Sequence, residues 1–237
     1  DYAFNQEEMF AAEGPSAVPE PLNKLRWLAS LYPEVVQVIA SADAGIDTIS
    51  DLKGKRIAVG APGSGHEANA RQILMAHGFS YDDFARVDFI MHTEAGDAIK
   101  DGHLDAYFTT AGIPTASAVD IFSTHDVKLV RVENEMAENI VEEWPFYAKF
   151  TIPAGTYSGQ DEPVETLAVM AALLINADVD EDLAYNLTKA LFENLDVMAA
   201  THQRGADITL EGALEGQALE LHPGVAKYYE EVGALNK

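Results

Sequence analysis

The sequence contains no cysteine. A chain without thiols forms no disulfide, has no thiol nucleophile and offers no thiolate to a metal ion. The enzyme and metal-site classes that depend on cysteine are therefore excluded. A chain free of cysteine also suits an envelope protein of a bacterium.

Basic residues are scarce. The chain has 15 Lys and Arg against 39 Asp and Glu, and its formal net charge is −24 at pH 7. Such a surface repels nucleic acids and anionic membranes, so neither is expected as a partner. The acidic residues are spread through periodic segments instead of forming a tail, which argues against disorder. They suggest a high-salt habitat, where salt screens the self-repulsion.

Long apolar runs and familiar catalytic motifs are also missing. No run reaches the roughly 18 residues of a membrane helix. Residues 1–5 show neither the basic region nor the cleavage site of a secretory signal peptide, so we expect none. The sequence has no His-Glu-x-x-His motif, no Gly-x-Ser-x-Gly motif and no Walker lysine. We therefore expect no metal, no cofactor and no catalytic residue.

The most informative stretch that is present is residues 60–67, Gly-Ala-Pro-Gly-Ser-Gly-His-Glu. It follows the apolar run 56–59 and precedes a helical pattern at 68–75. The N–H groups at a helix start have no partner within the helix, and the helix dipole places partial positive charge there. This order predicts an anion site that needs no lysine. A plain tight turn is the alternative.

Residues 56–132 alternate between strand and helix patterns. This alternation predicts an α/β lobe with a largely parallel sheet. The predicted strands are 56–59, 87–91, 104–110 and 127–132, and the predicted helices follow at 68–77, 94–100 and 115–122.

The flanking segments carry further apolar patterns. Residues 25–31 and 35–40 are predicted strands, and the run 166–176 fits a buried strand that crosses between lobes. Residues 180–200 predict an amphipathic helix, because large apolar side chains recur at helical spacing. They are Leu183, Leu187, Leu191, Leu195 and Met198.

Several blocks, in this order, resemble the TAXI family of solute-binding proteins, which serve tripartite ATP-independent periplasmic (TRAP) transporters. The resemblance covers nearly the whole chain and depends on the order of the blocks. They are residues 28–34, 51–56, 60–65, 108–114, 152–157, 187–194 and 221–229.

This resemblance implies an α/β, two-lobed type II periplasmic-binding-protein-like fold that closes on a small anion. Lobe I is then residues 1–44 and 146–237 with the crossing strands, and lobe II is residues 45–145. Family members carry an upstream strand, glycine-rich loop and helix, so the first lobe lacks its N-terminal part in this chain. Some members bind glutamate or related small acids.

Open α/β sheets place ligands beyond the carboxyl ends of their strands, and two such ends are rich in small residues. At the first, Ser64 and the backbone of Gly65 and His66 are predicted to donate to a ligand carboxylate. His66 replaces a small hydroxyl residue that is common in the family. It either adds a donor or is a solvated residue at the helix start.

At the second strand end, residues 110–112 (Thr110, Ala111 and Gly112) are predicted to line the same wall; an ordinary strand-to-helix turn is the alternative. Tyr32 is predicted to pack on the carbon skeleton of the ligand, or else is an ordinary buried tyrosine. Tyr157 is a weaker candidate for the rim.

Together these features predict an extracytoplasmic, periplasmic solute-binding protein that delivers a small, glutamate-like carboxylate to the membrane subunits of a TRAP permease. No nucleic acid, membrane insertion or chemistry on the ligand is expected. The alternatives are a sensory binding protein that reports to a receptor and an enzyme on the same two-lobed scaffold.

Overall fold

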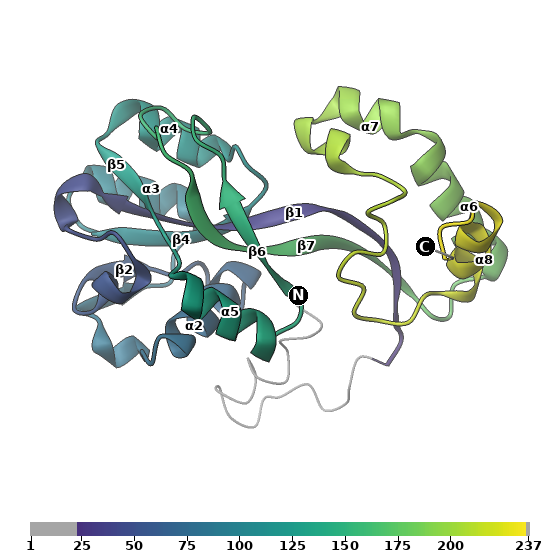
Figure 1. Ribbon diagram of the computed structural model, residues 1–237, viewed down its shortest axis with the longest axis horizontal. Coiled ribbons are helices and arrows are strands. Elements are labelled where there is room, and N and C mark those ends of the chain that lie inside the picture. Colours follow the sequence, from purple (N-terminus) through teal and green to yellow (C-terminus); the bar gives the residue numbers. More distant parts are fainter. Residues whose placement is uncertain (1–22, 236–237) are drawn as a thin grey trace. The chain divides into compact units, whose positions relative to one another are not determined.

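The computed structural model describes residues 23–235 (Figure 1). The chain divides into two compact units. Of the described residues, unit 1 comprises 34–169, and unit 2 comprises 23–33 and 170–235. The expectation about a signal peptide falls on residues 1–5, which lie outside the described residues. That the two units are the predicted lobes, 1–44 with 146–237 and 45–145, stays a proposal.

Unit 1 is built on one sheet with helices between its strands. The strand that enters from unit 2 is β1 (Leu25–Ser41), and the strand that returns is β7 (Val164–Asn176). Between them lie β2 (Arg56–Ala58), α2 (Gly65–Ala76), β3 (Arg86–Asp88), α3 (His92–Lys100), β4 (Ala106–Ala111), α4 (Ala116–Thr124), β5 (Val127–Val130), α5 (Asn134–Glu143) and β6 (Tyr147–Ile152).

The strands follow the order β3-β2-β4-β1-β7-β6, and β5 also pairs with β1. β2 is parallel to β3 and to β4, whereas β1 is antiparallel to both β4 and β5, and β6 is antiparallel to β7. The predicted α/β class is confirmed. The four strands within residues 56–132 (β2, β3, β4 and β5) share one direction, as the predicted largely parallel sheet requires. The antiparallel neighbour of β4 and β5 is β1, which comes from outside that segment and inserts between them.

The predicted strands 25–31 and 35–40 are one continuous strand. Pro33 lies inside β1 at the junction of the two units, where it interrupts the pattern that sequence analysis uses to recognise a strand. Proline breaks the donor ladder of a strand without preventing an extended backbone.

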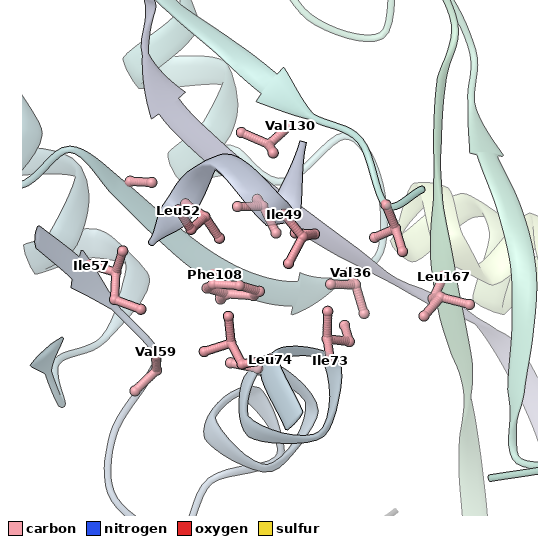
Figure 2. Close-up of a cluster of buried hydrophobic side chains, with 14 of the residues drawn as sticks. Val36, Ile49, Leu52, Ile57, Val59, Ile73, Leu74, Phe108, Val130 and Leu167 are labelled. Atoms are coloured by element: carbon pink, nitrogen blue, oxygen red, sulfur yellow. The ribbon is translucent and has the colours of Figure 1, made fainter. Parts of the chain in front are cut away.

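The two faces of the sheet carry separate apolar cores, because successive side chains of a strand point to opposite faces. On one face, Val36 and Phe108 pack against Ile73 and Leu74 of α2, as Figure 2 shows. On the other face, Tyr107 packs with side chains from β1, α3 and α4, among them Val35, Ile39, Ala95, Ile121 and Phe122.

Unit 2 combines its parts of β1 and β7 with α6 (Glu181–Glu193), α7 (Leu195–Thr201) and α8 (Pro223–Glu231). The predicted single helix 180–200 is therefore wrong, since it is interrupted at Asn194. The core of the unit is formed by side chains that include Leu28, Ala29, Ile175, Ala184, Val225, Tyr228 and Tyr229.

Part of the apolar stripe of α6 is exposed. Leu183 and Leu187 are 52% and 48% exposed, while Ala184 and Thr188 are buried. A close helix crossing contributes: a Cβ on Gly224 of α8 would lie 2.1 Å from the carbonyl oxygen of Glu181 and 3.0 Å from the Cβ of Ala184. Only a small side chain such as that of Ala184 fits there, and of the stripe Leu191 packs against the unit 2 core.

Candidate functional site

Three helices of unit 1 begin at the same edge of the sheet. β2, β3 and β4 are parallel, so their carboxyl ends share an edge. α2 begins seven residues after the end of β2, α3 four residues after β3 and α4 five residues after β4. Each helix start offers unpaired N–H groups and the positive end of a dipole. This edge therefore favours an anion.

The β2–α2 turn, residues 59–64, is buried at Val59 and Gly60 and becomes half-buried or exposed from Ala61 onward. Ser64 caps α2: its Oγ accepts from the N–H of Glu67 at 3.2 Å, which leaves the hydroxyl proton free to donate. In the part of the chain that the structure describes, the N–H groups of Gly65 and His66 have no acceptor. The predicted donors Ser64, Gly65 and His66 therefore lie together at one helix start.

Two glycines give this turn its form. Gly60 has φ of +102°, and a Cβ there would lie 2.7 Å from the Cβ of His66. Only glycine fits this close approach without strain. A Cβ on Gly65, by contrast, would meet no atom within 4 Å, so the space beside its N–H is open.

The His66 ring is held in one orientation and one neutral tautomer. Its Nδ1 accepts from the backbone N–H of Thr110 at 2.9 Å, so the proton of the neutral ring sits on Nε2. Desolvation, and in second place the neighbouring His92, lower the pKa of His66. A neutral imidazole with a fixed Nε2–H is a donor that adds no positive charge.

His92, which sequence analysis missed, opens α3 beside this ring. The ring centroids of His66 and His92 lie 5.5 Å apart. The Nδ1 atom of His92 is buried and has no hydrogen-bond partner in residues 23–235, and burial lowers the pKa of the ring. The sequence did carry a signal for His92. It stands where strand β3 leads into helix α3, as His66 stands where β2 leads into α2.

A buried polar network ties α2 to the sheet. Asn69 Nδ2 donates to Thr110 Oγ1 at 3.2 Å, and the Tyr147 hydroxyl lies 2.8 Å from Asn69 Oδ1 and 2.7 Å from Gln72 Oε1. Burial raises the pKa of Tyr147, so its hydroxyl keeps its proton. Because Thr110 also holds His66, the helix start is fixed relative to β4.

The β4–α4 turn contains the predicted wall residues. Thr110 is buried, whereas Ala111 and Gly112 are half-buried and follow it directly. The carbonyl of Ala111 accepts from Gln37 Nε2 at 3.4 Å, and the carbonyl of Gly112 accepts from Thr115 Oγ1 at 3.0 Å. All three are therefore placed beside the β2–α2 turn by the bond from Thr110 to His66.

Tyr157 supports the β4–α4 turn from behind. Its hydroxyl donates to Gln37 Oε1 and accepts from the N–H of Thr115 at 3.0 Å, and its ring stacks on Phe122 with centroids 4.9 Å apart. It packs with the core on the Tyr107 face, opposite the face that carries Thr110. Its predicted contact with ligand stays a prediction.

Tyr32 belongs to unit 2, within β1, and is half-buried. Its predicted contact with the ligand likewise stays a prediction.

Glu34, the first residue of unit 1, also escaped sequence analysis. It is half-buried, and desolvation raises the pKa of its carboxyl. Between residues 23 and 235, no hydrogen bond or ion pair reaches it. The available signal was a carboxylate directly before the largely apolar segment of β1 that pairs with β4.

The arginine of α2 is already paired. Arg71 Nε lies 3.2 Å from Glu67 Oε1, which also accepts from the Tyr81 hydroxyl at 2.6 Å. Arg71 Nη2 is buried without a hydrogen-bond partner in the described part of the chain. The start of α2 therefore carries donors, while the guanidinium of the same helix is held by a carboxylate.

Two searches of the described residues bear on other functions. They contain no cluster of three or more histidine or carboxylate side chains suited to a metal ion. None of their helices is long and apolar enough to span a bilayer.

Comparisons with known proteins give a family and distant structural relatives. The profile of the NMT1-like family matches residues 3–233. The periplasmic aliphatic sulphonate-binding protein SsuA of Escherichia coli is 15% identical, with a TM-score of 0.46; the match covers 95% of this chain and 59% of that protein. The chain thus spans about three fifths of that relative.

Two further solved structures match this chain with similar sequence identity, coverage and TM-score. A protein of Bordetella bronchiseptica RB50 is 17% identical over 98% of this chain and 62% of its own, with a TM-score of 0.48. An ancestral arginine-binding protein bound to glutamine is 18% identical over 77% and 61%, with a TM-score of 0.39. The α/β class is confirmed by the sheet of unit 1 and the helices between its strands. The two-lobed, periplasmic-binding-protein-like arrangement stays a proposal.

Proposed function

The chain belongs to the NMT1-like family, and from that premise we propose that it is an extracytoplasmic protein that captures a small organic anion for a membrane transporter. The observation that carries the proposal is the start of α2. There the unpaired N–H groups of Gly65 and His66 lie beside the Ser64 hydroxyl and the neutral His66 ring.

The ligand group that fits these donors is a carboxylate. Main-chain N–H groups and a hydroxyl bind an oxyanion without a basic side chain, because the helix dipole supplies partial positive charge. Ser64, Gly65 and His66 hold the anion, and Thr110, Ala111 and Gly112 line the wall next to it. A sulfonate is the competing anion, since N–H groups donate to either oxyanion.

The transporter that we propose is of the TRAP type, with this protein as a TAXI-like binding component located in the periplasm. The support is the order of the sequence blocks, from residues 28–34 to residues 221–229. The partners are then the membrane subunits of the permease, and a glutamate-like acid is the proposed cargo.

We propose binding without chemistry. The side chains gathered at the helix start are hydroxyl and imidazole groups that act as donors. Among residues 23–235, the recorded partner of Ser64 Oγ is a backbone N–H and not a base that could activate it. A sensory protein that reports to a receptor uses the same binding step. Incubation with a bound acid, followed by mass spectrometry, separates a binder, which returns the acid unchanged, from an enzyme.

The test of the function combines ligand identification with one charge substitution. Mass spectrometry of small molecules released from the purified protein is expected to find a carboxylate or sulfonate, whose affinity is then measured by calorimetry. Ser64→Asp keeps a good helix cap but places a negative charge at the anion, so affinity should fall by tenfold or more, about 1.4 kcal/mol.

Ser50→Asp is the matched control. Ser50 is exposed before the amino end of β2, where its N–H donates to Glu133 Oε1 at 3.2 Å. The substitution adds the same charge at the other edge of the sheet, so affinity should stay within about twofold of the original protein. Equal losses of affinity in Ser64→Asp and Ser50→Asp would contradict binding at the start of α2.

A further inference from the structure

We propose that the start of α4 holds a small inorganic anion of halide size, on the face of the sheet opposite the one that carries α2. This site is separate from the proposed function, because it is formed by other residues and takes a different ligand. All of its residues belong to unit 1.

The start of α4 is buried but not capped. The side chain of its N-cap residue, Thr115, makes no capping bond, and its hydroxyl donates to the Gly112 carbonyl at 3.0 Å. In the part of the chain that the structure describes, the N–H groups of Ser117 and Ala118 have no acceptor, and Ala118 is 0% exposed. A buried N–H group without a partner is unfavourable, so this helix start needs an acceptor.

Two hydroxyl groups near this helix start also lack partners. Thr109 is 0% exposed, and its Oγ1 has no hydrogen-bond partner among residues 23–235. The buried Oγ of Ser117 has none within the same range. Buried hydroxyls are normally hydrogen-bonded. Thr109 comes from β4 and not from the helix, so it is an independent sign that a group belongs here.

Strand pairing places Thr109 at the start of α4. Thr109 of β4 lies opposite Gln37 of β1, and Gln37 Nε2 donates to Thr115 Oγ1 at 2.9 Å. Opposite residues of paired strands share a face, with Cβ atoms about 5 Å apart. Thr109 therefore lies beside the residue that reaches the N-cap of α4, on the face where Ala118 packs.

The free groups can all donate, which favours an anion over a water molecule. A water molecule has protons of its own to donate. The carbonyls of this turn are already engaged, that of Ala111 with Gln37 Nε2 and that of Gly112 with Thr115 Oγ1. An anion accepts from the N–H groups and from both hydroxyls, and the helix dipole adds partial positive charge.

The surroundings also limit the charge and the size of the ion. The carboxylate of α4, on Asp120, is exposed and lies 2.6 Å from Lys100 Nζ, so its charge is largely offset. The Oγ atoms of Thr109 and Ser117 are shielded from solvent, which excludes a ligand as large as an organic acid. A monovalent ion such as chloride or bromide meets both conditions.

The experiment measures thermal unfolding in sodium chloride, bromide and gluconate at one ionic strength, which keeps screening constant. Gluconate is too large for the buried site. Each halide should raise the melting temperature above its value in gluconate, by about 5 °C or more at roughly a hundredfold excess over the dissociation constant. Thr109→Val keeps the shape of the side chain but removes the hydroxyl, so it should lose at least half of this shift. In gluconate it should melt no lower than the original protein.

Thr188→Val is the matched control, because Thr188 is also 0% exposed but lies in α6 of unit 2. It should keep the whole halide shift. A crystal grown in bromide should show anomalous scattering between Thr109 and the start of α4.

Three results would overturn the halide site. They are equal melting temperatures in all three salts, a halide shift that Thr109→Val retains in full, and bromide scattering at the start of α2 with none at α4. None of them contradicts the proposed function, which concerns organic anions at the start of α2.

Discussion

The β2–α2 turn and the β3–α3 turn join neighbouring parallel strands to neighbouring helices, yet they are built differently. The first has six residues, 59–64, and a serine cap, with glycines at 60, 63 and 65. The second has three residues, 89–91, and its cap position is Met91, whose side chain makes no capping bond. Both place a histidine in the first turn of the helix.

The difference between the two turns indicates what a strand–helix junction needs, besides its helix dipole, to hold the proposed anion. Parallel pairing brings both helix starts to one edge, so the dipoles alone do not distinguish them. The first turn adds close backbone approach at Gly60 and a histidine ring fixed by Thr110. The second adds a ring, His92, with an unpaired nitrogen. We infer that the first turn holds the anion and that the second completes its surroundings.

The largest expected effect is a loss of stability when the β2–α2 turn is distorted. Gly60→Ala puts a Cβ on a residue with positive φ and 2.7 Å from the Cβ of His66, so the free energy of unfolding should fall by about 3 kcal/mol. Gly78→Ala is the control, because Gly78 also has positive φ but its Cβ meets nothing within 4 Å. It should cost about 1 kcal/mol. Urea unfolding measures both, and equal losses would show that the close approach is unimportant.

The second effect separates binding from folding. Gly65→Ala fits the fold, since a Cβ there meets no atom within 4 Å. It covers the approach to the first free N–H of α2, so the affinity for the anion should fall about tenfold, roughly 1.4 kcal/mol. Gly96→Ala, the same change in α3, fits 3.9 Å from Ile121 and should leave affinity unchanged. Calorimetry that finds both variants unchanged would remove the Gly65 N–H from the site.

The smallest effect is on the pH dependence of stability. His66 and His92 have pKa values below the usual 6.5. As the pH falls below 6.5 the unfolded chain takes up protons first, so the free energy of unfolding decreases on acidification. His66→Asn and His92→Asn should each flatten this slope between pH 7 and 5, measured by urea unfolding. His103→Asn, at an exposed position, should leave it unchanged; equal flattening in all three variants would contradict the assignment.

Carboxylates act in a separate pH range. The hydrogen bond from Arg56 lowers the pKa of Asp105 below its usual 3.8. Its contribution to stability is present above 3.8 and is lost as the pH falls through the lowered pKa. The histidine slope is therefore measured in a range where Asp105 stays ionised.

The first turn was predictable because its signals are local. The apolar run 56–59, the glycines and the Ser64 cap are consecutive in the sequence, and each has a direct conformational meaning. The strand–loop–helix order at residues 56–76 follows from them and agrees with the structure.

The rest depends on contacts between distant segments. His92 meets His66 only because β2 and β3 pair in parallel, and Gln37 reaches the carbonyl of Ala111 only through the pairing of β1 with β4. Strand pairing of this kind leaves no mark on the local sequence.

The exposure of Leu183 and Leu187 in α6 has the same origin. Their spacing correctly indicates a helix, but the close crossing at Gly224 favours the small side chain of Ala184 at the contact. Periodicity predicts that an apolar stripe exists and assumes that it faces the core.

The central claim is that main-chain N–H groups at the start of α2 hold the anion of the ligand. Amide NMR during a titration with L-glutamate and with taurine tests it most directly. The claim predicts that the amide protons of Gly65 and His66 shift downfield with the ligand that binds, more than those of Thr93 and Glu94 at the start of α3. A ligand that saturates the protein and leaves the Gly65 and His66 amides in place would contradict it.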